Sequence, residues 1–139
     1  MTIDPAIASL SPPATLSIEL REGLPFFNEY NFQAGRDDTT PVNFTGVESA
    51  TCIVVNARTG ETVAVGTAGP VEGNPGETSG FTVAFSGAET AKVRSCCLAT
   101  PRTTAQPQEA GRVQVFFHDS DNRYMIIDGP CYLRFAGND

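Results

Sequence analysis

The stretch Gly111–Ala136, GRVQVFFHDSDNRYMIIDGPCYLRFA, decides the fold class. Its first part alternates between apolar and polar residues, so that Val113, Val115 and Phe117 share one face of an extended chain. Strict alternation of this kind is the pattern of a β-strand with one buried face. We therefore expect Arg112–Phe117 to be a strand whose three alternate side chains enter the core.

Two more apolar runs follow in the same stretch, Arg123–Ile127 and Cys131–Phe135. The residues that separate the runs, His118–Asn122 and Asp128–Pro130, are rich in Asp, Asn, Gly and Pro, which favour turns. Three β-rich runs separated by turn residues are typical of consecutive antiparallel strands. The stretch therefore predicts an all-β sandwich or barrel.

Earlier parts of the chain repeat this pattern. Alternating or β-rich runs predict further strands at Thr15–Arg21, Phe26–Phe32, Ala50–Val55, Glu61–Gly66 and Gly80–Phe85. The side chains expected to point inward include Leu16, Ile18, Leu20, Phe26, Tyr30, Phe32, Phe81, Val83 and Phe85. Together with a short extended piece at Pro41–Gly46, the runs predict an antiparallel β-sandwich of roughly eight to nine short strands.

The connections between these runs carry their own signals. Asn56–Gly60 is expected to be a hairpin turn, because its glycine accepts a positive φ. Ser86 and Glu89 have the spacing of a helix capping box, which predicts a single helical turn. Thr67–Ser79 and Arg94–Ala110 are polar and rich in turn residues, so both are expected to be loops.

The length and charge of the chain limit the classes of function. A chain of 139 residues predicts one folded domain, which we place at residues 15–139. The formal net charge of −7 argues against a nucleic-acid partner, since phosphate binding depends on clustered Lys and Arg. No apolar run reaches the roughly 18 residues that span a bilayer, and no signal peptide is recognisable. Synthesis in a cytoplasm, with no membrane partner, is the expectation.

Residues 1–14 form a proline-bearing segment before the first predicted strand. Pro5, Pro12 and Pro13 remove backbone donors, so the segment is expected to be an extended arm rather than a helix or a central strand. Two interpretations remain open: a frayed terminus, and an arm that docks on a neighbouring subunit. The apolar residues that would make the docking contacts are Ile3, Ile7 and Leu10.

The four cysteines, Cys52, Cys96, Cys97 and Cys131, lack the spacing of a redox motif or a zinc site. Without a secretion signal, reduced thiols are the default. We therefore expect structural cysteines that do not form disulfides.

His118 is the only histidine and lies close to Asp119 and Asp121, which raises the question of a metal site. A calcium loop of the EF-hand type that begins at Asp119 would need Gly at its sixth position and Glu at its twelfth. Those positions hold Tyr124 and Pro130, so a solvated hairpin turn is the preferred interpretation. No metal is predicted.

No nucleophile elbow, phosphate loop or dinucleotide fingerprint is present, and the carboxylates form no pattern that assigns acid and base roles. We therefore expect no enzymatic activity and no cofactor. Exposed aromatic side chains could instead stack on sugars, and the candidates are Tyr30, Tyr124 and Tyr132. The competing interpretation is that each ring packs against the core with its hydroxyl at the rim.

Four segments together resemble a known family: Asn43–Gly46, Ala57–Gly60, Gly80–Thr90 and Arg112–Phe135. Their order is similar to that of the immunoglobulin-like N-terminal domain of phage upper-baseplate and tail-fibre attachment proteins. The resemblance covers about residues 15 to 136. The connection Arg94–Ala110 is longer than is usual in that family.

The resemblance implies an immunoglobulin-like sandwich and a role as a bacteriophage virion structural or assembly protein. It would serve as a tail, baseplate adaptor or head-decoration subunit and act by protein–protein docking. Its partners would be other virion proteins and copies of itself in a symmetric homo-oligomer. It would reside in the virion after synthesis in the bacterial host cytoplasm. The alternative from another class is a carbohydrate-binding adhesion module that uses the three tyrosines.

Overall fold

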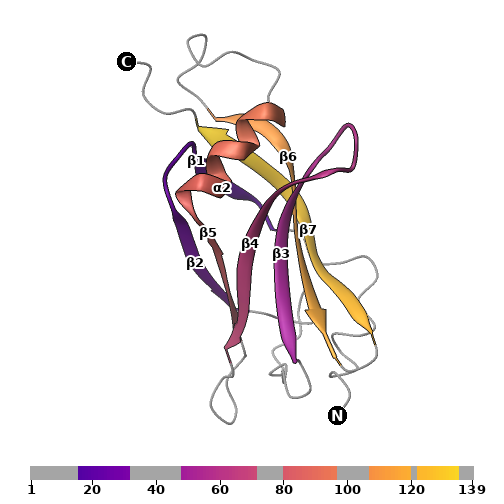
Figure 1. The fold of residues 1–139 in the computed structure, drawn as a ribbon. Helices are drawn as coiled ribbons and strands as arrows, with labels where there is room; N and C mark the ends of the chain where they lie inside the picture. Colours follow the sequence, from indigo (N-terminus) through magenta and orange to yellow (C-terminus); the bar gives the residue numbers. More distant parts are fainter. Residues whose placement is uncertain (1–15, 32–47, 72–79, 97–106, 120–121, 135–139) are drawn as a thin grey trace.

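The computed structural model describes residues 16–31, 48–71, 80–96, 107–119 and 122–134, and these form a mostly β structure (Figure 1). The strands are β1 (Ile18–Arg21), β2 (Phe26–Asn31), β3 (Ser49–Asn56), β4 (Thr62–Val71), β5 (Gly80–Phe85), β6 (Gln108–His118) and β7 (Arg123–Arg134). One short helix, α2 (Gly87–Lys92), continues into a 3-10 turn, η1 (Val93–Cys96). The predicted all-β class is confirmed. The arm with Ile3, Ile7 and Leu10, and the motif Asn43–Gly46, lie outside the described residues.

The seven strands form one sheet in the order β1-β7-β6-β3-β4-β5-β2. The two end strands, β1 and β2, are joined by only four residues, Glu22–Pro25. The sheet must therefore curl until its two edges approach each other, and it forms a nearly closed barrel (Figure 1).

The sheet is mixed, because β1 pairs with β7 in parallel while the other five pairs are antiparallel. The prediction of a wholly antiparallel arrangement is wrong at this pair. Strands β1 and β7 come from opposite ends of the chain, so no short turn between them imposes an antiparallel direction.

The core lies inside this curled sheet and is built by the alternation seen in the sequence. Val113, Val115 and Phe117 on β6 are fully buried, as predicted. The rings of Phe81 and Phe117 meet edge to face, with centroids 6.4 Å apart. The other alternating side chains expected inside and found buried are Ile18, Leu20, Val83 and Phe85. Leu16, Phe26 and Tyr30 are partly buried against the same core, whereas Phe32 lies outside the described residues.

The predicted break at Asp128–Pro130 is wrong, because β7 continues through it. Gly129 is required there, since a Cβ at this position would overlap the backbone oxygen of Leu16, where the chain enters β1. Pairing between β7 and β1 includes Cys131 but not Pro130. The proline therefore lies where β7 has a strand on one side only, which is where a sheet tolerates it.

Two predicted loops are also shorter than expected. Strand β4 runs on to Val71, although Thr67–Ser79 was expected to be a loop. It does so by changing partner at Thr67, from β3 to β5. Backbone pairing supports this extension without any apolar periodicity. Within Arg94–Ala110, the first three residues belong to η1 and the last three belong to β6.

Helix α2 lies across one end of the barrel (Figure 1). Its N-cap is Ser86, whose side-chain oxygen accepts a hydrogen bond from the Glu89 backbone N–H at 3.2 Å, as predicted. The Glu89 carboxylate does not complete a reciprocal capping box. It accepts instead from the backbone N–H of Val65 on β4 at 2.8 Å. Because β5 pairs with β4 only from Thr67 onward, Glu89 satisfies a donor that the sheet leaves free.

Candidate functional site

The feature that stands out as a candidate site is the outer edge of β2. Strand β2 is the last in the sheet order and pairs through Phe26–Asn31 with β5. Among the described residues, no other strand pairs with β2. Its second edge therefore presents backbone groups that no described strand pairs, although the Glu29 N–H there already donates to the side-chain oxygen of Asn28 at 2.9 Å.

The side chains of β2 divide between the two faces of the sheet. Phe26 packs near Phe85 with ring centroids 6.5 Å apart, and Tyr30 packs on Phe81 with centroids 5.5 Å apart. Phe27 points to the opposite face and is 70 % exposed, the largest exposed fraction among the large apolar side chains described. The Phe27 ring is therefore not part of the core, and a single exposed apolar side chain of this kind is common on protein surfaces.

Leu24, 53 % exposed, precedes β2 in a turn whose backbone is held in place. Gly23 adopts a φ of +77°, and the Leu24 N–H donates to the Arg21 carbonyl at 3.1 Å. The Leu24 carbonyl accepts from the hydroxyl of Thr90 on α2 at 2.9 Å. The helix thus fixes the point at which β2 begins and, with it, the direction of the exposed edge.

The two edge strands differ in how they are protected. Strand β1 alternates buried apolar residues with the exposed charges Glu19 and Arg21, and Glu19 lies 3.4 Å from Arg134. Strand β2, FFNEYN, carries one charge, Glu29, and has no Lys, Arg or Pro. Charges and prolines are the usual means of preventing edge-to-edge association. By this criterion β1 is protected and β2 is open.

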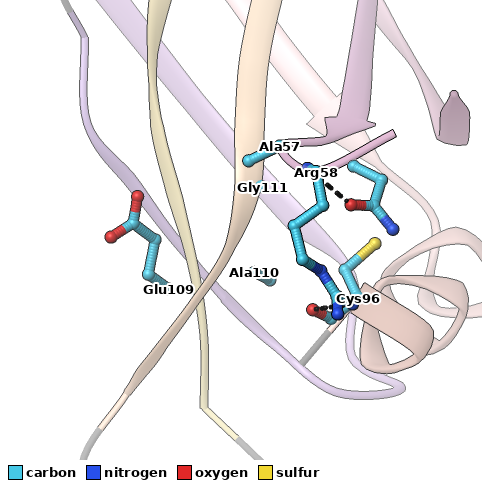
Figure 2. Close-up of a pocket in the computed structure, with 7 residues that line it drawn as sticks. Ala57, Arg58, Cys96, Glu109, Ala110 and Gly111 are labelled. Carbon is cyan, nitrogen blue, oxygen red and sulfur yellow. Dashed lines mark hydrogen bonds between the residues drawn. The ribbon is translucent and has the colours of Figure 1, made fainter. Parts of the chain in front are cut away.

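A cavity of about 270 Å³ lies between the β3–β4 hairpin, η1 and the start of β6 (Figure 2). It is lined by Asn56, Ala57, Arg58, Cys96, Glu109, Ala110 and Gly111. The Arg58 guanidinium donates to the Cys96 carbonyl at 3.4 Å. Figure 2 shows Glu109 pointing away from both of these residues. The cavity therefore brings no acid and base together.

The cysteines near the core are unsuited to nucleophilic chemistry. Cys52, Cys96 and Cys131 are buried, and Cys97 lies outside the described residues. Burial raises the pKa of the Cys52 thiol to about 12, and it also raises the pKa of Cys96. Both groups are therefore neutral thiols at physiological pH, and the thiolate is the reactive form.

Side chains of the polar turn between β6 and β7 form hydrogen bonds within the turn and to a neighbouring strand. The backbone N–H of Asn122 donates to the Asp119 carboxylate at 2.7 Å, and the N–H of Asp119 donates to the Asn122 carbonyl at 3.0 Å. His118 Nε2 lies 3.1 Å from the Thr51 hydroxyl. Asp121 falls outside the described residues, among which no group of three potential metal ligands occurs.

Of the three candidate sugar-binding tyrosines, Tyr132 faces away from the core against which Tyr30 and Tyr124 pack. Tyr30 lies on β2 against Phe81, and Tyr124 on β7 packs partly against the core. A bulge at Ile126 shifts the alternation of β7, so that Tyr124 and Tyr132 point to opposite faces of the sheet and Tyr132 lies on the outer face. The two residues are eight positions apart along the strand, which corresponds to roughly 25 Å. The structure therefore separates Tyr132 from Tyr124, whereas Tyr30 and Tyr124 both pack against the core.

Sequence reasoning missed the exposed edge of β2, although a signal was present. Phe26 and Phe27 are adjacent, and successive side chains of a strand point to opposite faces. One of the two rings must therefore lie outside the core if the segment is a strand. The sequence did not predict which strand lies at the end of the sheet, because the strand order depends on pairing between distant segments.

No protein-family model matches the chain, and no relative is found among curated proteins. Within the described ranges, no helix is both long and apolar enough to cross a membrane.

Proposed function

We propose that the chain is a bacteriophage virion structural or assembly protein: a tail, baseplate adaptor or head-decoration subunit. It acts by docking to other virion proteins and to copies of itself in a symmetric assembly, and it resides in the virion after synthesis in the bacterial host cytoplasm. The observation that supports docking is the open edge of β2 with the exposed ring of Phe27. The assignment to a virion rests on the family resemblance of Gly80–Thr90 and Arg112–Phe135.

The finer fold assignment that goes with this proposal is an immunoglobulin-like sandwich. In that fold the strands A, B, E and D belong to one sheet and C, F and G to the other. If β2 to β7 are taken as B to G, the pairs β2–β5, β5–β4, β3–β6 and β6–β7 agree with this order. Strand β1 departs from this order, because it pairs with β7, the counterpart of G, and not with β2, the counterpart of B. The change of partner within β4 would mark the place where one sheet passes into the other.

The carbohydrate-binding alternative has less support, because Tyr124 and Tyr132 lie on opposite faces of β7. The carbohydrate-binding alternative can be tested by titrating the protein with glycans. Saturable glycan binding that is abolished by replacing Tyr124 or Tyr132 would favour it over docking.

Virion association is tested by peptide mass spectrometry of purified phage particles from the host that encodes the chain. The proposal predicts that peptides of this protein copurify with the particles in a fixed ratio to the other structural proteins. Particles of full infectivity from which the protein is absent would contradict it. An immunolabel on the same particles would show whether the protein lies on the head or on the tail.

A further inference from the structure

We draw no further inference here: the strongest candidate, the cavity between the β3–β4 hairpin, η1 and the start of β6, points to no ligand, because its two charged side chains, Arg58 and Glu109, are exposed and no buried side-chain polar atom among the described residues lacks a hydrogen-bond partner.

Discussion

The hydroxyl of Thr90 provides the sharpest test of how the open edge is held in place. Thr90 is fully buried, and its hydroxyl lies 2.9 Å from the Leu24 carbonyl and 3.0 Å from the Gly87 carbonyl. The contact to Leu24 joins α2 to the turn before β2. Replacement by Val keeps the shape of the side chain and removes the donor. It therefore isolates the hydrogen bond from the packing.

The expected cost of Thr90→Val follows from two opposing terms. A part-buried carbonyl left without its donor costs up to about 1–3 kcal/mol, while an extra buried methyl group returns about 0.8 kcal/mol. The free energy of unfolding should therefore fall by about 0.2–2.2 kcal/mol. Urea unfolding followed by circular dichroism measures this change, and the slope with denaturant should stay the same because the fold does not change.

A matched control separates the hydroxyl from the methyl group. Thr90→Ser keeps the donor and loses one buried methyl, so its cost should be about 1 kcal/mol and should come from packing alone. Hydrogen exchange of the Leu24 region should rise in Thr90→Val but not in Thr90→Ser. The reasoning is refuted if Thr90→Val is as stable as the wild type, or if the two variants loosen the turn equally.

Three further predictions address the sheet, the helix and the core. Gly129→Ala should lower the free energy of unfolding by about 2 kcal/mol or more, because its Cβ must displace the Leu16 backbone. In the control Gly69→Ala, the new Cβ meets only a side-chain oxygen at 3.1 Å. If urea unfolding showed the same loss of stability for both variants, the close approach of Leu16 to Gly129 would be contradicted. The hydrogen bond from Lys92 and that from the Val65 N–H lower the pKa of Glu89, so its contribution to stability is present above its unfolded pKa and is lost as the pH falls through the lowered folded pKa. The stability difference between wild type and Glu89→Gln should accordingly shrink on acidification, and a pH-independent difference would speak against the ion pair. Cys52, with a pKa of about 12, should resist alkylation at pH 8 until the protein unfolds, as followed by peptide mass spectrometry; rapid native labelling would show that it is not buried.

The sequence predicted the inward-facing residues well because a strand repeats every two residues. Val113, Val115 and Phe117 could be assigned to one face without any knowledge of their neighbours. The helix start at Ser86 was equally accessible, since a cap depends on residues only three positions apart.

The parts that were missed depend on contacts between distant segments. Gly129 and Pro130 have the composition of a turn, and only the arrival of β1 beside the following residue explains why the strand continues. The extension of β4 past Thr67 depends in the same way on β5. The open edge of β2 follows from the order of all seven strands, which no local pattern encodes.

The central claim is that this chain works by docking through the edge of β2, and amide hydrogen exchange tests it most directly. Exchange is compared between the dilute chain and the assembled state, whether that state is a dimer or a complex with a virion partner. The account predicts slower exchange across Phe26–Asn31 on assembly, with β1 unchanged, because new main-chain hydrogen bonds form only at the open edge. Assembly that leaves exchange in β2 unaltered would contradict it.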